Sequence, residues 1–385
     1  MAEKTFKQLV LQGKGGPWTI NEKPIPKAGV GQIVVKMTAC SICNQTDLNT
    51  VRALHPPHDH QIEGMVPHHF RQWDNRLDGD PLQDAYPSQR YELEPYPTTM
   101  GHEGTGIVVD VGPMPDEVYP MGADHKGSNK LLFMDQGNGF KVGDRVSMVG
   151  TIGGFGEYIV SPVNEAIKVP DNVPDDVASL FEPTMITNVI AFNNVRMNDV
   201  VFIMGQGALG LLSTQLAKIY GAKTVITSDP VPMKRELSKK LGADYVIDPT
   251  TEKVVDRVLE LTGGHGVDTI IEAAGVPETI SLIPYLGKWG CRVGQIGACC
   301  VPVLVDWSYI HFKGYQVTGT NYAMLNMGGM EIAKQRAMEM MASGRLKYDD
   351  IITHRLPLTV EATNDIFKKI EKGDEVIKAI YVMDK

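Results

Sequence analysis

The chain has 385 residues and a mass of 42.2 kDa, which is more than one hydrophobic core usually supports, so we expect two domains. Hydrophobic residues make up 43% and charged residues 22%, which argues against long disorder. A formal charge of -9 offers no basic surface for nucleic acid, and no stretch predicts a membrane span. Because the N-terminus lacks the pattern of a signal peptide and the five cysteines lack framework spacing, we place the protein in the reducing cytoplasm.

The first part of the chain predicts an irregular, mostly β domain. Short β-type runs occupy Gln32–Lys36 and Gly106–Val109, and glycine turns such as Lys141–Asp144 separate such runs. Two polar stretches, at about residues 48–100 and 113–138, interrupt the pattern as insertions. Loops of this length are often lids or binding segments, so we expect the first to cover the substrate. A contact between subunits is the alternative role.

The pattern becomes regular from Val200 onward. The apolar run Val200–Met204 predicts a strand, and a helical stripe of leucine and isoleucine follows it through Ile219. Further strands and helices are expected to alternate after this pair, namely strands at Thr224–Thr227, Tyr245–Ile247 and Thr269–Ile271 and helices at Met233–Leu241 and Val254–Leu261. Continuous apolar strands that alternate with helices indicate a doubly wound parallel sheet, covered on both faces, in an α/β domain.

A glycine-rich turn joins the first of these strands to its helix. Its residues are Gly205, Gln206, Gly207, Ala208, Leu209 and Gly210. Such a turn lets the backbone approach a pyrophosphate, which then lies on the helix N-terminus. Asp229 ends the next strand, and its carboxylate would bind the adenosine ribose and repel a 2′-phosphate, which favours NAD over NADP. A role in a Ser-Asp-Pro turn is the alternative, and Lys234 and Arg235 nearby could weaken the preference.

Two short segments upstream carry side chains that bind metals. Cys43 stands four residues before Asp47, and His102 and Glu103 follow a glycine. Alone, Cys43 could be a buried structural thiol and His102 a histidine satisfied by its turn. Glu182, just before the nucleotide domain, could complete a set of three. A catalytic zinc has three protein ligands drawn from Cys, His and carboxylates and keeps its fourth position for water or substrate.

Several ordered motifs carry a resemblance to a known family. They are Gly101–Gly104, Val142–Val146, Gly154–Tyr158, Glu182–Pro183 and the glycine turn at 205–210. On these motifs the chain resembles the medium-chain dehydrogenase/reductases of the zinc-dependent alcohol and polyol dehydrogenase type. The resemblance implies a mostly β, GroES-like catalytic domain of residues 1–184 and 323–385 and a Rossmann domain of residues 185–322. It also implies a homodimer or homotetramer.

The resemblance also implies roles for individual residues. Cys43, His102 and Glu182 would bind zinc, and Glu103 would either stand behind these ligands or exchange with one of them. Asp47 would orient His102 through the ring nitrogen that does not bind metal. Thr46 would hydrogen-bond the substrate hydroxyl and accept its proton.

The chain departs from the family pattern at three places. It has an additional residue, Asn44-Gln45, between the thiolate and Thr46, which puts the register of Thr46 in doubt. Asn49 stands where a proton-relaying histidine is common, and a histidine of the insertion such as His55 is a possible substitute. Residues 113–150 contain no cysteine, so we expect no second, structural zinc and a single catalytic one.

These features predict hydride transfer between a secondary alcohol or polyol and NAD, which gives the ketone or aldehyde. Zinc would lower the pKa of the bound hydroxyl. Two other functions remain open at this stage: a zinc-free NAD(P)H-dependent reductase of an activated C=C bond, and a non-catalytic NAD- or zinc-binding protein. The side chains of residues 48–100 suit a polyol, an acid or an aromatic alcohol equally well.

Overall fold

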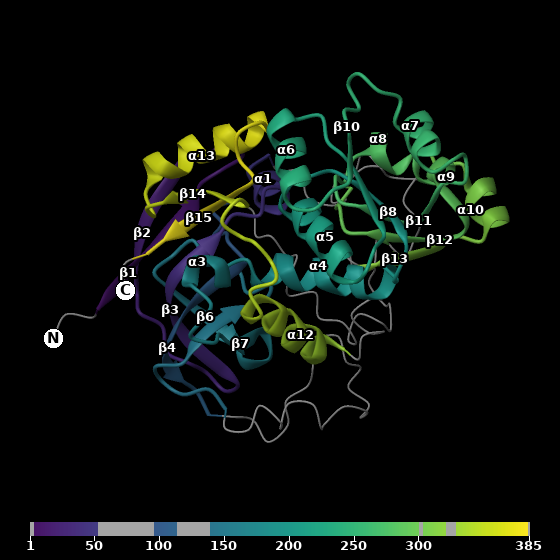
Figure 1. The fold of residues 1–385 in the computed structure, drawn as a ribbon. Coiled ribbons are helices and arrows are strands. Elements are labelled where there is room, and N and C mark those ends of the chain that lie inside the picture. Colours follow the sequence, from purple (N-terminus) through teal and green to yellow (C-terminus); the bar gives the residue numbers. More distant parts are fainter. Residues whose placement is uncertain (1–3, 53–95, 114–138, 300–302, 321–328, 384–385) are drawn as a thin grey trace, which may run out of the picture. The chain divides into compact units, whose positions relative to one another are not determined.

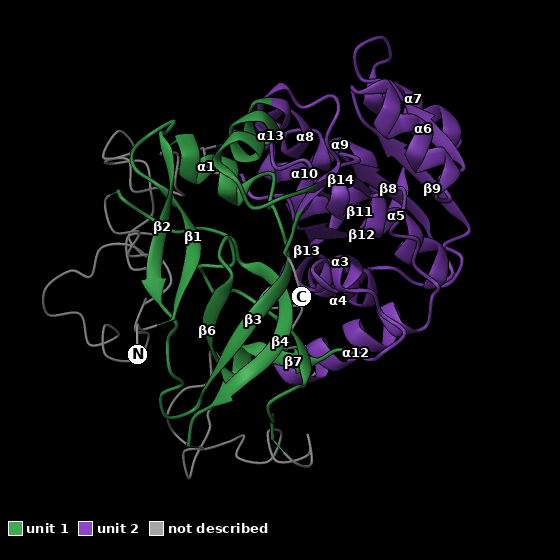
Figure 2. Cartoon of the chain, turned by 90° about the vertical axis from the view of Figure 1, so that its left-hand side faces the viewer, with its two compact units in different colours: residues 1–169, 356–368, 381–385 green, residues 170–355, 369–380 purple. Residues whose placement is uncertain are grey.

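The computed structural model describes residues 4–52, 96–113, 139–299, 303–320 and 329–383. The chain divides into two compact units, shown in green and purple in Figure 2. Unit 1 comprises residues 1–169, 356–368 and 381–385, and unit 2 comprises residues 170–355 and 369–380. The division thus assigns alternating parts of the C-terminal tail to the two units. The expected domain boundaries at residues 184, 185, 322 and 323 stay a prediction.

Unit 1 is mostly β, as the sequence predicts. Its strands are β1 (Thr5–Leu11), β2 (Trp18–Pro24), β3 (Gln32–Ser41), β4 (Glu103–Val111), β5 (Arg145–Met148), β6 (Tyr158–Pro162) and β7 (Ala166–Lys168). β1 and β2 form an antiparallel pair, and a larger sheet has the order β14-β15-β3-β4-β5-β7 with β6 paired to β3 (Figure 1). This sheet takes in β14 (Ile352–Leu356) and β15 (Lys378–Val382) from the tail.

The core of unit 1 lies on β3, whose residues are almost all buried. The rings of Phe155 and Tyr381 meet edge to face with centroids 4.9 Å apart, and Trp18 stacks on Phe367 at 5.3 Å. These contacts join the N-terminal strands to the C-terminal end of the chain. Short helical elements complete this part of the fold, namely α1 (Thr46–Arg52), η2 (Val163–Glu165) and α13 (Val360–Lys372).

Unit 2 contains a six-stranded parallel sheet with the order β10-β9-β8-β11-β12-β13. The strands are β8 (Val200–Met204), β9 (Thr224–Ser228), β10 (Tyr245–Ile247), β11 (Val267–Glu272), β12 (Gly287–Gln295) and β13 (Gln316–Gly319). Counted from the first strand, this is the order 3-2-1-4-5-6 of dinucleotide-binding sheets, whose ligands bind outside the carboxyl ends of the strands. The predicted Rossmann fold is therefore confirmed.

Unit 2 also contains helices. They are α3 (Asp175–Ala178), α4 (Phe181–Asn194), α5 (Ala208–Ile219), α6 (Pro232–Lys240), α7 (Val254–Leu261), α8 (Pro277–Ile280), α9 (Ile283–Leu286), α10 (Trp307–Lys313) and α12 (Met330–Ala342). Of these, α4, α5, α6, α9 and α10 contact strands of the sheet. The strands expected at Val200–Met204 and Tyr245–Ile247 have these same bounds, and the helix expected at Met233–Leu241 is shifted by one residue. Sequence patterns did not reveal β12 and β13.

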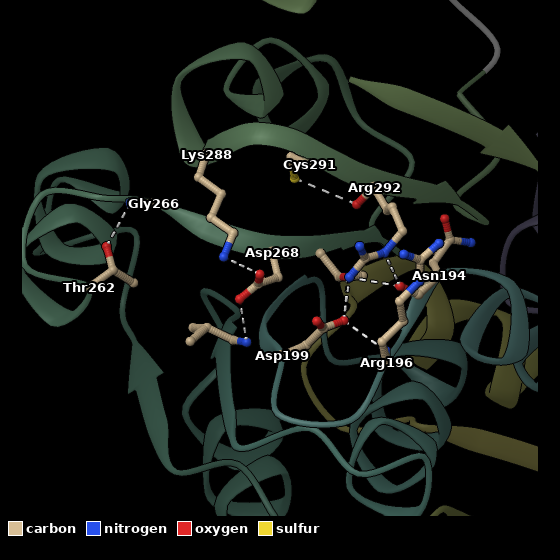
Figure 3. A network of polar contacts seen from close by, with 11 residues as sticks. Asn194, Arg196, Asp199, Thr262, Gly266, Asp268, Lys288, Cys291 and Arg292 are labelled. Carbon is tan, nitrogen blue, oxygen red and sulfur yellow. Dashed lines mark hydrogen bonds and ion pairs between the residues drawn. The ribbon is translucent and has the colours of Figure 1, made fainter. Parts of the chain in front are cut away.

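A buried ion pair joins the end of helix α4 to β11, β12 and the residue before β8 (Figure 3). The Arg292 guanidinium in β12 lies 2.5 Å from an Asp199 carboxylate oxygen and donates to the Asn194 carbonyl at 2.6 Å. The same Asp199 oxygen accepts from the Thr269 hydroxyl and the Arg196 amide. Both charged side chains are about nine-tenths buried. Removal of one charge would leave the other buried without its partner.

We therefore expect Arg292→Met to lower the free energy of unfolding by about 3–5 kcal/mol, the usual cost of breaking a buried pair. Arg257→Met is the matched control, because Arg257 forms an exposed ion pair with Glu260. Loss of this pair should leave the urea midpoint of unfolding nearly unchanged. Urea denaturation followed by circular dichroism measures both. Equal shifts in the two variants would contradict the structural role given to Arg292.

Candidate active site

The antiparallel register of β3 and β4 brings the predicted metal ligands together. Ser41, the last residue of β3, pairs with Glu103, the first residue of β4. Cys43 follows β3 by two residues and His102 directly precedes β4, so both lie at the same edge of the sheet. Residues nearly sixty positions apart in the sequence thereby become neighbours. Gly101 has φ +89°, and a Cβ there would lie 2.4 Å from the Phe155 ring, so this turn requires glycine.

Cys43, His102 and Glu103 form a group that could hold a metal ion. The Cys43 sulfur, a ring nitrogen of His102 and a carboxylate oxygen of Glu103 all lie within 4.8 Å of one another. Within the described residues, no other group of three such side chains brings its ligand atoms this close. Ligand atoms on one tetrahedral zinc lie roughly 3.3–3.8 Å apart, so small side-chain rotations would suffice. A thiolate, an imidazole and a carboxylate are the donors that zinc takes in proteins, and the residues therefore fit this ion.

Asp47 lies where the sequence predicts a residue that orients His102. Its carboxylate is buried, with one oxygen 3.7 Å from His102 Nδ1 and the other accepting the Cys43 amide at 2.8 Å. A carboxylate beside Nδ1 favours a proton on that nitrogen and leaves Nε2 for a metal. Asp47 thus contacts the backbone of one candidate ligand and faces the ring of the other.

The additional residue at Asn44-Gln45 lies within a turn that leads into α1. Two hydrogen bonds close this turn: the Thr46 amide donates to the Cys43 sulfur at 3.4 Å, and the Asp47 amide donates to the Cys43 carbonyl at 3.0 Å. The additional residue therefore leaves Thr46 and Asp47 beside the thiol.

Sequence reasoning missed the contact between Ser41 and Glu103. The Ser41 hydroxyl, fully buried, donates a hydrogen bond to Glu103 Oε2. This contact fixes one carboxylate oxygen of a residue that could bind or exchange with a metal. Only the strand register, which no local pattern shows, could have revealed it.

The third expected ligand, Glu182, belongs to the other unit. It is the second residue of α4 and is partly buried. Its role as a zinc ligand stays a prediction. The insertion at residues 113–138 lies outside the described residues apart from Pro113, and so does that at 48–100 apart from its two ends.

The glycine turn at 205–210 has the geometry of a pyrophosphate cradle. Gly205 has φ +84°, and a Cβ there would lie 2.8 Å from Ala274. A Cβ on Gly210 would lie 1.9 Å from the Gly205 carbonyl oxygen, whereas one on Gly207 would meet nothing within 4 Å. The open space at Gly207 lies at the N-terminus of α5, where unpaired backbone amides and the helix dipole favour anions. Gln206 turns its side chain inward, to the Gly205 carbonyl and Thr214.

Asp229 connects this turn to the end of β9. One oxygen of its buried carboxylate accepts the Gln206 amide at 2.7 Å, and the other accepts the Val231 amide at 2.8 Å. Asp229 therefore stabilises both the glycine turn and its own turn. A carboxylate has about four acceptor positions, so two remain for a ribose. The turn role is present in the structure, and the ribose role stays a prediction.

A second buried carboxylate, which the sequence analysis did not single out, lies at the carboxyl end of β11. Glu272 accepts hydrogen bonds from the Ala274 and Gly275 amides at 2.9 Å and from the side chains of Thr279 and Gln295. Burial raises its pKa, while these donors act in the opposite direction. Glu272 thereby fixes two loops that border the crevice where such sheets bind nucleotides. The hint in the sequence was a glutamate that ends an apolar strand.

Comparisons with known proteins agree with this geometry. Residues 208–343 match the family model of zinc-binding dehydrogenases, and residues 80–171 match that of the alcohol dehydrogenase GroES-like domain. The L-threonine 3-dehydrogenase of Pyrococcus furiosus is 31% identical over 371 residues, which cover 93% of this chain and 91% of the relative. That of Pyrococcus abyssi is 32% identical over 367 residues, with the same coverage.

Solved structures share the fold over nearly the whole chain. The 2R,3R-butanediol dehydrogenase of Bacillus subtilis has a TM-score of 0.72 and 22% identity, and covers 98% of this chain and 100% of its own. The galactitol-1-phosphate dehydrogenase of Escherichia coli has a TM-score of 0.72 and 19% identity, with the same coverage. At this identity the likeness concerns the fold.

A GroES-like domain, a Rossmann sheet and a Cys-His-Glu group define the class as a nicotinamide-dependent alcohol or polyol dehydrogenase that acts on CH–OH groups. The chain belongs to the zinc-binding dehydrogenase family of the medium-chain dehydrogenase/reductase superfamily. The resemblance seen in the sequence is confirmed, and none of the relatives named here is a C=C reductase. Within the described residues, no helix combines the length and hydrophobicity needed to cross a bilayer.

The glycine turn gives a test that separates binding from folding. We expect Gly207→Val to weaken NADH binding by about tenfold or more with an unchanged unfolding midpoint, because its side chain enters space that only the dinucleotide needs. Gly210→Val should instead lower the midpoint, because its side chain meets the Gly205 carbonyl. NADH fluorescence titration and thermal unfolding measure the two effects. Normal NADH affinity in Gly207→Val would place the cofactor elsewhere.

Proposed function

We propose that the chain oxidises a secondary alcohol or polyol to the ketone or aldehyde, with one zinc held by Cys43, His102 and Glu182 and with NAD as the hydride acceptor. The observation that carries this proposal is the grouping of Cys43, His102 and Glu103 within 4.8 Å at the joined ends of β3 and β4. The donor set suits a Lewis-acidic zinc better than a structural site, which would use four protein ligands.

A bound zinc would supply a Lewis acid that lowers the pKa of the substrate hydroxyl. The residues of the chain perform the remaining tasks. Asp47 faces His102 Nδ1 with one carboxylate oxygen and would favour a proton there, and the Thr46 amide donates to the Cys43 sulfur. The Thr46 hydroxyl would accept the substrate proton at Oγ1. Because Asn49 cannot titrate, the proton would leave by a path that differs from the histidine relay common in the family.

Ser41 gives Glu103 a defined place in this mechanism. Its hydroxyl occupies Oε2 of the Glu103 carboxylate, so Glu103 would approach a metal through its other oxygen. By the family resemblance, Glu103 would stand behind the permanent ligands or exchange with one of them, which leaves an open position for the substrate.

The cofactor in this proposal is NAD rather than NADP. Asp229 keeps acceptor positions beside the glycine turn, where a ribose follows the pyrophosphate. Its negative charge opposes a 2′-phosphate. The relatives' names place L-threonine, 2,3-butanediol and galactitol 1-phosphate first in a substrate panel.

A homodimer or homotetramer is part of the proposal. β13 is the last strand of its sheet, and large apolar side chains on and near it are exposed, namely Trp289, Leu304, Trp307, Phe312 and Val317. An exposed strand edge flanked by aromatic residues is typical of a protein contact. A cytoplasmic location and a substrate-covering role for residues 48–100 stay expectations from the sequence.

The metal proposal predicts one zinc per chain. We expect Cys43→Ser and His102→Ala to lose zinc and turnover while NADH affinity changes by less than about twofold, since the dinucleotide turn lies on other elements. His265→Ala is the control. This histidine is exposed and lies just before the amino end of β11, whereas nucleotides bind at the carboxyl ends of such strands. Elemental analysis, NADH titration and turnover on the panel provide the readouts. Full activity in metal-free protein would contradict the proposal and favour a zinc-free reductase.

A further inference from the structure

Arg235 lies beside the turn that the ribose would occupy. It belongs to the first part of α6, and its guanidinium Nη1 donates to the carbonyl oxygens of Asp229 at 2.8 Å and Pro230 at 2.7 Å. Its Nη2 lies 2.7 Å from Asp248 Oδ2. The side chain is mostly buried, with 18% of its surface exposed. A cation is therefore fixed within hydrogen-bonding distance of the backbone of the ribose-binding candidate.

The Asp229 carboxylate is not the partner of this cation. Its two oxygens accept the backbone amides of Gln206 and Val231. Across the described part of the chain, no ion pair joins Arg235 to that carboxylate. The charge of Arg235 is balanced by Asp248, and the charge of Asp229 is left for the ligand.

Asp248 is itself held in place at the end of β10. Its Oδ1 accepts the Thr250 amide at 3.0 Å and the Thr250 hydroxyl at 2.6 Å, which leaves Oδ2 for Arg235. The hydrogen bonds from Thr250, and then the Arg235 charge, hold the pKa of Asp248 below its ordinary value. Asp248 is therefore ionised at neutral pH and presents a fixed negative charge to the guanidinium.

Enzymes that use NADP bind its 2′-phosphate with an arginine or lysine near this ribose. Arg235 has the right chemistry and lies in the first part of the helix that follows the Asp229 turn. Its guanidinium is already engaged, however, by two backbone carbonyls and by the Asp248 carboxylate. Asp229, Arg235 and Asp248 together carry one net negative charge, which opposes a phosphate that carries nearly two.

We propose that Asp248 is a specificity-determining residue, which withholds Arg235 from the 2′-phosphate and so makes the chain select NAD. This inference rests on the proposed function, in which Asp229 and its turn hold the adenosine ribose. Asp248 acts through Arg235 and does not itself need to touch the cofactor.

The test is fluorescence titration of the purified full chain with NADH and with NADPH. Asp248→Asn keeps the size of the side chain and removes its charge, and should strengthen NADPH binding by about tenfold while NADH affinity changes by less than about twofold. The double variant Asp248→Asn with Arg235→Leu should lose the gain, because the freed guanidinium provides it. Asp248→Ser is a second variant. Its short side chain cannot keep the hydrogen bond to Arg235 that the asparagine amide oxygen could still accept.

Asp350→Asn is the matched control. Asp350 forms a 2.7 Å ion pair with Lys240 at the far end of α6, so its loss removes a similar charge without freeing Arg235. Unchanged NADPH affinity in both Asp248 variants, with a normal unfolding midpoint, would overturn the inference, and so would a gain that persists without Arg235. The ratio of NADH to NADPH affinity in the wild-type chain tests the proposed function separately. Tighter binding of NADPH than of NADH by the wild-type chain would contradict NAD as its cofactor.

Discussion

The candidate metal site depends on one strand pairing. β3 and β4 run antiparallel with Ser41 opposite Glu103, so the segment after β3 and the segment before β4 meet at one edge of the sheet. Neither Cys43 nor His102 alone indicates a metal site. The register makes them neighbours, adds a buried carboxylate, and supplies Ser41 to hold one of its oxygens. Asp47 then joins both candidate ligands by accepting the Cys43 amide and facing the His102 ring.

In the candidate nucleotide site, hydrogen bonds from backbone amides to two buried carboxylates hold the loops in place. Asp229 holds the glycine turn and its own turn, and Glu272 holds two loops at the end of β11. Each carboxylate is buried and accepts hydrogen bonds from the backbone beside it, which fixes these loops. The chain thus fixes the shape of the crevice by backbone contacts and leaves the open space at Gly207 to the ligand. In the proposal above, cofactor choice depends on Arg235 and Asp248, which form an ion pair.

The sequence predicted the parts of this arrangement that local patterns encode. The apolar run of β8, which is buried apart from its first residue, and the glycine turn indicated the Rossmann fold, because a parallel strand buried on both faces is apolar throughout. β12 was missed, since Gly287–Gln295 contains three glycines and charged residues that hide its pattern. The register of Thr46 was doubtful, and the turn at Asn44-Gln45 resolves how the additional residue fits. The contacts Ser41–Glu103 and Arg235–Asp248 join residues distant in sequence, so no local pattern could show them.

X-ray absorption at the zinc edge of the purified, zinc-loaded chain tests the central claim most directly, because it counts the atoms that the joined ends of β3 and β4 would present. The account predicts one sulfur at about 2.3 Å, from Cys43, with the remaining ligands being nitrogen or oxygen at about 2.0–2.2 Å. A spectrum without sulfur would show that the pairing of Ser41 with Glu103 does not bring Cys43 to the metal. Two or more sulfurs would require a cysteine from outside this group and would equally contradict the account.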